Sequence, residues 1–209
     1  SDNKELKTVA TDSHRMSQKV ITLEKNGDNF DVVIPSRSLR EFTSVFSDDI
    51  ETVEVFFANN QILFRSEHIS FYTRLLEGNY PDTDRLIPTE FNTEATFNVA
   101  NLRFAMERAR LLSNATQNGT VKLEFKNGVV SSHVHSPEVG RVNEEIDTSA
   151  VSGEDLSISF NPTYLIEALK AIDSEQVVIR FISSVRPFTL VPEGNEQGFI
   201  QLITPVRTN

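Results

Sequence analysis

The sequence predicts an α+β fold of duplicated domains, each with two helices packed on antiparallel sheets. The chain passes three times through a strand, a short helix and two or three further strands. Each helix carries one apolar stripe, and the strand segments alternate apolar with polar residues, as half-buried helices and strands do. Because one helix and a few strands cannot cover both faces of a sheet, pairs of such modules are the expected stable domain.

The three copies open with a strand that leads directly into a helix. The strands are expected at 30–34, 95–99 and 156–160. Pro35 and Pro162 are pre-set for a first helical turn, while Ser36, Asn101 and Asn161 can cap free amides. The apolar stripes are Leu39, Phe42, Val45 and Phe46; Leu102, Ala105, Met106, Ala109 and Leu112; and Leu165, Ile166, Leu169 and Ile172.

Further strands follow each helix. They are expected at 53–57 and 62–64, at 121–125 and 129–130, and at 177–181 and 188–191. Asn59-Asn60 and Asn127-Gly128 predict hairpin turns. The opening segments 6–10 and 18–22 match the end of such a module. We therefore expect an incomplete domain at 1–87 and a complete one at 88–209, linked by the turn-rich stretch 77–88.

Composition excludes several classes of protein. The 209 residues include no cysteine, which rules out disulfides, thiolate metal sites and a cysteine nucleophile, and fits a cytoplasmic protein. No apolar run approaches the roughly 20 residues that span a bilayer, and the start resembles no signal peptide. The net charge of −10 argues against nucleic acid, yet a clustered basic face can coexist with an acidic exterior.

Catalytic and metal-site interpretations have little support. Asp12, Ser13 and His14 are consecutive, whereas a catalytic triad converges from separate segments. His133 and His135 alternate along a strand, but two ligands do not make a metal site. With neither a phosphate-binding nor a dinucleotide-binding motif, we expect no catalytic residue, no metal and no cofactor. A hydrolase that uses these histidines is the alternative in the enzyme class.

Four phrases, on this repeat and in this order, resemble the bacterial DNA sliding clamp, the β subunit of DNA polymerase III. They are Ala10–Arg15, Tyr80–Asp82 before Arg85–Pro88, Arg110–Asn114 and Leu202–Arg207. The resemblance covers essentially the whole chain, without the family's first domain and about half of its second. It implies duplicated DNA-clamp domains in a non-catalytic, nucleoid-associated processivity factor. Two full-length protomers would close head to tail around duplex DNA. They would tether the polymerase III catalytic subunit, other DNA polymerases, the clamp loader and mismatch-repair proteins.

The resemblance also implies a cleft between the second and third domains that binds peptides similar to Gln-Leu-x-Leu-Phe. Met16, Leu86, Ile203 and Val206 are expected to form an apolar pocket with an arginine rim. Taken alone, the residues favour an ordinary buried strand at Leu202-Ile203 and an exposed turn at His14-Arg15. The family phrase often has Gly where Ser13 stands. The matching residues are Thr11, Ser13, His14, Arg15, Met16, Pro81, Arg85, Leu86, Val185, Pro187, Leu202, Ile203, Thr204, Pro205, Val206 and Arg207.

Basic residues on the helix faces opposite the apolar stripes are expected to face DNA, through weak attraction to phosphates that ignores sequence. They are Arg37, Arg40, Arg103, Arg110 and Lys170. The alternative is a solvated helix face, since Glu41, Glu107 and Glu167 lie among them and can form local ion pairs. If the helix faces meet no phosphate, the protein would be a peptide-binding adaptor without a role on DNA.

Overall fold

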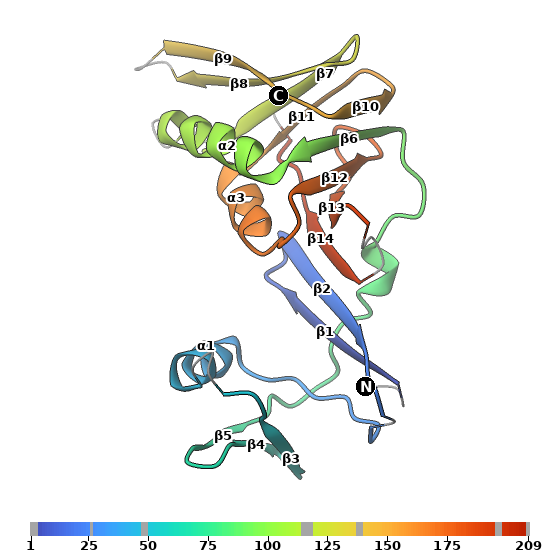
Figure 1. The fold of residues 1–209 in the computed structure, drawn as a ribbon. Helices are drawn as coiled ribbons and strands as arrows, with labels where there is room; N and C mark the ends of the chain where they lie inside the picture. The colour runs from blue at the N-terminus through green and yellow to red at the C-terminus, as the bar shows by residue number, and fades with distance from the viewer. Residues whose placement is uncertain are drawn as a thin grey trace. The chain divides into compact units, whose positions relative to one another are not determined.

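The structure, a computed structural model, describes residues 4–25, 27–46, 50–113, 119–136, 140–194 and 198–207. Asn114, which ends one of the four phrases, lies outside these residues. The chain forms two compact units (Figure 1). Unit 1 contains Lys25–Asp82, and unit 2 contains Glu5–Glu24 with Thr83–Asn209. The α+β prediction is confirmed, because helices pack on sheets whose strands are all antiparallel.

The described part of unit 1 contains one helix and a three-stranded sheet. Helix α1 covers Ser36–Val45, and strands β3 (Glu54–Ala58), β4 (Gln61–Arg65) and β5 (Ser70–Arg74) pair in that order. Its core is small, with Phe46, Ile62 and Phe64 buried and the ring of Phe42 packed against Phe64. The predicted stripe on α1 is therefore only half right. Leu39 and Val45 are exposed, because no described element of unit 1 buries them.

The strand expected at 30–34 was wrong. Only Val33 pairs there, through an isolated bridge in which the amide of Leu76 donates to the Val33 carbonyl at 2.8 Å. The alternating apolar residues fit a strand, but no described segment of unit 1 continues the ladder on either side of Val33. Local pattern without a pairing partner gives extended chain and no sheet.

Among its described residues, unit 2 holds two sheets and two long helices. One sheet has the order β1-β2-β14-β13-β12-β6-β10, and the other β11-β7-β8-β9. The helices are α2 (Val99–Ser113) and α3 (Pro162–Lys170), and a short 3-10 helix, η1, covers Asp84–Leu86. The strands are β1 (Glu5–Thr11), β2 (Arg15–Thr22), β6 (Thr93–Asn98), β7 (Val121–Lys126), β8 (Val129–Ser136), β9 (Gly140–Ile146), β10 (Ala150–Gly153), β11 (Leu156–Phe160), β12 (Gln176–Phe181), β13 (Phe188–Pro192) and β14 (Phe199–Ile203).

The core of unit 2 lies between its helices and its two sheets. The stripes predicted on α2 and α3 are confirmed, since Leu102, Met106, Leu165 and Leu169 belong to one buried cluster with residues of both sheets. Asn161 caps α3 as expected, its side-chain oxygen accepting from the Thr163 amide at 2.9 Å. The β7–β8 turn is also confirmed as a hairpin, with positive φ at both central residues.

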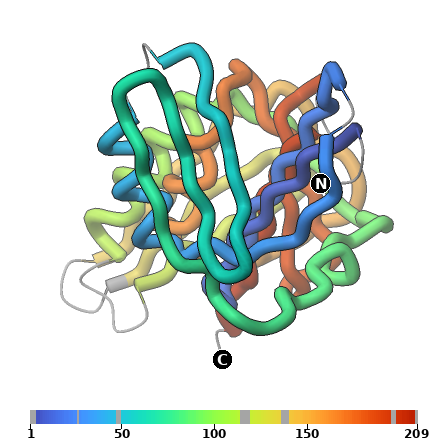
Figure 2. Tube along the Cα trace, turned by 90° about the horizontal axis from the view of Figure 1, so that it is seen from below, coloured from blue at the N-terminus to red at the C-terminus, as the bar shows by residue number. Residues whose placement is uncertain are grey.

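The N-terminal hairpin β1–β2 joins the large sheet of unit 2, because β2 pairs with the C-terminal strand β14. Figure 2 shows this hairpin in blue beside the red C-terminal strands. The predicted boundary at residue 87 stays a prediction. The pairing brings residues about 185 positions apart in the chain into one sheet, and it positions the candidate site.

Candidate functional site

Strand register decides which predicted cleft residues share a face. Met16 pairs with Leu202, and Arg15 pairs with Ile203. Side chains of neighbouring residues in a strand point to opposite faces, so Leu202 and Ile203 diverge. Ile203 is 1% exposed and belongs to the cluster that contains the helices. Met16 and Leu202 therefore lie on the face away from the helices, which we call the outer face.

This register corrects the prediction for Ile203, which was expected to line an apolar pocket. Ile203 is a core residue, and Leu202 replaces it beside Met16. Both outer-face side chains are themselves buried, at 2% for Met16 and 5% for Leu202. The alternative interpretation of Leu202-Ile203 as a buried strand is correct as far as burial goes.

The segment 83–92 runs across this outer face. At one end Lys7 of β1 pairs with Asp84. At the other end the guanidinium of Arg180 lies 5.6 Å from the Phe91 ring, and the Asn92 amide donates to the carbonyl of Phe181 in β12. Since β2, β14 and β13 lie between β1 and β12, the segment passes over them, which accounts for the burial of Met16 and Leu202. Leu86 is 52% exposed within it.

A tight turn joins β1 to β2 at the end of the sheet. The Asp12 carboxylate accepts from the amides of His14 and Arg15, both at 3.2 Å, and the Thr11 hydroxyl donates to the Arg15 carbonyl at 2.8 Å. Ser13 has φ of 72°, a left-handed conformation that glycine adopts without strain. The turn thus forms with Ser13 as the residue that bears this conformational cost.

Arg15 connects this turn to α3. Its Nε donates to Asp12 at 2.8 Å, its Nη1 pairs with Glu167, and its guanidinium lies 4.7 Å from the centre of the Tyr164 ring. The His14 ring stacks on Tyr164 at 6.1 Å and 14°. Tyr164 and Glu167 were not predicted as site residues. Their one sequence signal is their spacing of three in α3, which places them on one side of the helix.

The ionisation of this cluster follows its hydrogen bonds. Burial acts to raise the pKa of Asp12, but hydrogen bonds from Arg15 and the His14 amide outweigh it and hold the pKa below its ordinary value. Burial acts to lower the pKa of Arg15, whereas the carboxylates of Glu167 and Asp12 raise it. Both groups therefore remain charged in the pair at neutral pH.

The C-terminal segment continues from β14 past the turn. The Thr204 amide donates to the His14 carbonyl at 2.9 Å, and the Val206 amide donates to the Ser159 carbonyl at 2.7 Å. Pro205 is half-buried, Val206 is 36% exposed and Arg207 is exposed. Because Phe188 pairs with Ile203, Pro187, which comes directly before β13, lies near this segment. Val185, two residues earlier in the chain, is 52% exposed.

The structure thus brings the turn 11–15, the end of β14 and the C-terminal segment together at one end of the large sheet of unit 2. Thr11, Ser13, His14 and Arg85 are exposed. Pro81 belongs to unit 1 and is not placed relative to them. Two buried polar atoms on the outer face, Gln18 Oε1 and Thr189 Oγ1, have no hydrogen-bond partner among the described residues.

The predicted DNA-facing residues have mixed surroundings. Arg37 pairs with Glu41 at 3.0 Å, and Arg103 lies 3.8 Å from Glu107, as the local-pair alternative expected. Arg40 and Lys170 are exposed and Arg110 is half-buried. Glu167, which was also expected to pair locally on its helix, pairs instead with Arg15. Contact with DNA remains a prediction for all five basic residues.

Of the two histidines of β8, His133 has ordinary polar partners. His133 is hydrogen-bonded through Nδ1 to Asn143 at 2.8 Å and through Nε2 to Ser131 at 2.9 Å. Among the described residues, no three side chains of His, Cys, Asp or Glu gather as metal ligands. None of the helices in the described part of the chain has the length and apolar character needed to cross a membrane.

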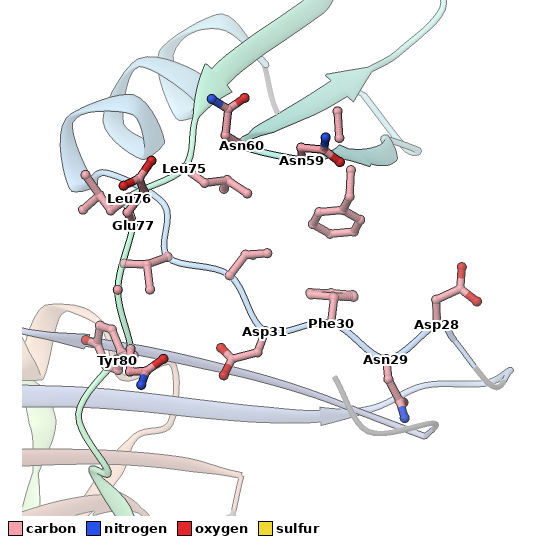
Figure 3. Close-up of a pocket in the computed structure, with 16 residues that line it drawn as sticks. Asp28, Asn29, Phe30, Asp31, Asn59, Asn60, Leu75, Leu76, Glu77 and Tyr80 are labelled. Atoms are coloured by element: carbon pink, nitrogen blue, oxygen red, sulfur yellow. The ribbon is translucent and has the colours of Figure 1, made fainter.

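A hollow of about 570 Å³ lies in unit 1, and none of the predicted site residues lines it. The rings of Phe30 and Phe57 lie 4.5 Å apart on one wall, tilted by 35°. Figure 3 shows that the carboxylates of Asp28, Asp31 and Glu77 lie apart around it. They therefore do not form a cation site.

Two family models match the chain. The C-terminal domain of the DNA polymerase III beta subunit matches residues 84–207, and the central domain of the same protein matches residues 1–82. The beta sliding clamp of Streptococcus pneumoniae serotype 4 is 80% identical over all 209 residues, and that of Lactococcus lactis is 56% identical over 207 residues, or 98% of the chain. The chain spans about half of these relatives, 55% and 54% of their lengths.

Solved structures agree in fold. The DNA polymerase III beta chain of Streptococcus pneumoniae superposes with a TM-score of 0.96 at 80% identity, and the polymerase beta subunit from Streptococcus pyogenes with 0.95 at 70% identity. Each match covers the whole chain, and 55% and 56% of the solved chain respectively. The duplicated clamp-domain fold expected from the repeats is confirmed. The chain belongs to the family of the DNA polymerase III beta subunit, whose members are the beta sliding clamps.

Proposed function

We propose that the whole protein of which this chain is part acts as a sliding clamp in bacterial DNA replication, and that unit 2 binds client peptides at the end of its outer face. The observation that carries the proposal is the pairing of β2 with β14. That pairing brings the turn 11–15, the start of β13 and the segment 204–207 together. Such a surface joins apolar side chains to a few polar groups, as peptide grooves do.

Exposed apolar residues define where a peptide would bind. Leu86, Val185 and Val206 are 36–52% exposed, so a ligand can bury them without unfolding the domain. Met16 and Leu202 would extend the apolar surface if segment 83–92 shifts on binding. Burying a large apolar side chain contributes roughly 1.5–3 kcal/mol. A Gln-Leu-x-Leu-Phe peptide with two such side chains should bind with a Kd on the order of micromolar, about −8 kcal/mol.

Titration of a labelled Gln-Leu-Ser-Leu-Phe peptide by fluorescence anisotropy tests the site. Leu86→Ala should weaken binding by about tenfold, because roughly half of a leucine contact is worth about 1.4 kcal/mol. Leu111→Ala is the matched control, since Leu111 is 72% exposed on α2 of the same unit and belongs to none of the site segments. His133→Ala and His135→Ala should also bind as the parent does. Equal binding by the parent and Leu86→Ala would refute the assignment of the site.

The proposal for DNA is that two full-length protomers form a head-to-tail ring, with duplex DNA passing through it. A closed ring needs no sequence contacts, so helix-face cations such as Arg40, Arg110 and Lys170 would supply weak attraction to phosphates. The protein would then be cytoplasmic, associated with the nucleoid and non-catalytic. Its clients would be the polymerase III catalytic subunit, other polymerases, the clamp loader and mismatch-repair proteins.

The adaptor alternative has one observation in its favour, which is the pairing of Arg37 and Arg103 with glutamates beside them. Retention of the full-length protein on circular DNA, and its release when the circle is cut, separates the two functions. A clamp is retained on closed circular DNA and released from the cut, linear DNA, whereas an adaptor is retained on neither the circular nor the linear form. Peptide binding without any retention on circular DNA would favour the adaptor.

A further inference from the structure

Resting on the proposed peptide site, we propose that Glu167 of α3 is a positioning residue for that site, acting through Arg15. The pair joins two elements that are distant in the chain, since Arg15 begins β2 and Glu167 lies in the second half of α3. Glu167 itself belongs to none of the segments that carry exposed apolar site residues. Its effect on a bound peptide would pass through the turn that Arg15 holds.

The contacts of Arg15 leave little of its guanidinium available to a ligand. One edge donates to Asp12, another nitrogen pairs with Glu167, and one face lies over Tyr164. A guanidinium that is held by carboxylates on two edges and by a ring on one face has a fixed orientation, because its planar array of N–H donors fits the geometry of carboxylate oxygens. Arg15, which the resemblance places on the polar rim of the cleft, is therefore a structural link between the turn and α3.

The link between Arg15 and Glu167 sets the position in space of the first residues of the C-terminal segment. With Arg15 drawn to Glu167, the neighbouring His14 ring lies stacked on Tyr164. The carbonyl of His14 then accepts from the Thr204 amide, the first residue after β14. Pro205 and Val206 follow directly, so a shift of the turn away from α3 would displace the segment that carries Val206. The local hydrogen bonds of Asp12 and Thr11 keep the turn's shape but do not set its position on α3.

The expected size of the effect follows from exposure. Half of the Glu167 side chain and a third of the Arg15 side chain are exposed, so solvent screens the pair. Exposed pairs of this kind shift an equilibrium by a few-fold. We expect Glu167→Gln to fold normally and to bind the Gln-Leu-Ser-Leu-Phe peptide about threefold more weakly at low salt. The difference from the parent should shrink towards 1 M salt, where screening acts over about 3 Å.

Glu144→Gln is the matched control, because it removes an ion pair of the same unit, Arg108 with Glu144, that involves no site segment. It should leave peptide affinity unchanged, while Glu167→Asp, which keeps the charge, should restore part of the loss. A double-mutant cycle with Arg15→Gln should be non-additive, since both changes remove the same pair. Affinities of Glu167→Gln and the parent that agree at every salt concentration would overturn the proposal.

Amide hydrogen exchange at Thr204 tests the link without any peptide. Glu167→Gln should exchange the Thr204 amide several-fold faster than the parent, and Glu144→Gln should not. If the parent binds no peptide but Thr204 responds in this way, the proposed peptide function fails and the positioning of the segment by Glu167 stands. If the parent binds peptide and Thr204 exchanges equally in both proteins, the role of Glu167 is refuted and the peptide site stands.

Discussion

Replacing Gly153 by alanine should destabilise unit 2 far more than the same change at Gly128. Both glycines have left-handed backbones, with φ of 96° and 79°, so alanine costs about 1–2 kcal/mol of conformational strain at either position. They differ in space. A Cβ at Gly153 would lie 1.9 Å from the carbonyl oxygen of Asn92, whereas nothing lies within 4 Å at Gly128.

The clash at Gly153 cannot be relieved by a side chain. Ordinary contact begins at 3.4 Å, so the Asn92 carbonyl would have to move by about 1.5 Å. That carbonyl accepts from the Glu154 amide at 3.0 Å, and the Asn92 amide donates to Phe181 in β12 at 2.8 Å. Losing both hydrogen bonds costs about 1–3 kcal/mol. With the strain included, Gly153→Ala should lose about 2–5 kcal/mol and Gly128→Ala about 1–2 kcal/mol.

The difference in stability between the two variants is measured by urea unfolding, with amide exchange of core residues such as Phe97 as the probe. Because this probe reports on unit 2 alone, it does not assume that both units unfold together. The two variants differ from the parent by one methyl group each, so composition and charge are matched. Equal loss of stability in the two variants would refute the close approach of Asn92 to β10. It would also mean that the contact between Asn92 and β10 does not fix the point where segment 83–92 leads into β6.

Three further predictions concern the site. Deleting Pro205–Asn209, whose last two residues lie outside the described part, removes Val206 and the hydrogen bond from its amide to Ser159. In a fluorescence anisotropy titration, this deletion should weaken peptide binding at least tenfold, which is about 1.4 kcal/mol. Ser13→Gly should raise the free energy of unfolding by up to about 1 kcal/mol, because glycine adopts φ of 72° without strain; an unchanged urea midpoint would contradict this. The pKa of Asp12 is lower in the folded than in the unfolded state. Its ionised carboxylate therefore stabilises the fold fully at pH values above the unfolded pKa of about 4, and this stabilisation is lost as the pH falls through the lower folded pKa. Asp12→Asn should therefore flatten the acid limb of thermal stability, and an identical limb would show that Asp12 does not couple to folding.

Local sequence pattern predicted most elements of the fold because each was locally determined. The stripes on α2 and α3 have helical spacing, and both helices bury them in unit 2. The β7–β8 turn needs left-handed backbone at two residues, which Asn127 and Gly128 supply. Where a stripe met no partner, the same reasoning failed. Leu39 and Val45 are exposed although their spacing matches that of the buried stripes.

The candidate site depended on information that spacing does not contain. Leu202 and Ile203 are adjacent apolar residues, and only the register with Met16 and Arg15 shows which one faces the helices. The pairing of Glu167 with Arg15 joins residues separated by 152 positions, and no local pattern marks it. The resemblance to a family supplied the list of site residues, but it could not separate side chains at the surface from side chains in the core.

The same register makes the peptide site and the stability of unit 2 interdependent. Slipping β14 by one residue against β2 would turn its side chains to the opposite faces, so Leu202 would leave Met16 and enter the core beside Phe188, while Ile203 would turn to the outer face. The packing of Ile203 in the core therefore also fixes Leu202 beside Met16. Substitutions at Ile203 should therefore alter peptide binding only together with stability, whereas substitutions at Leu86 or Val206 should alter binding alone.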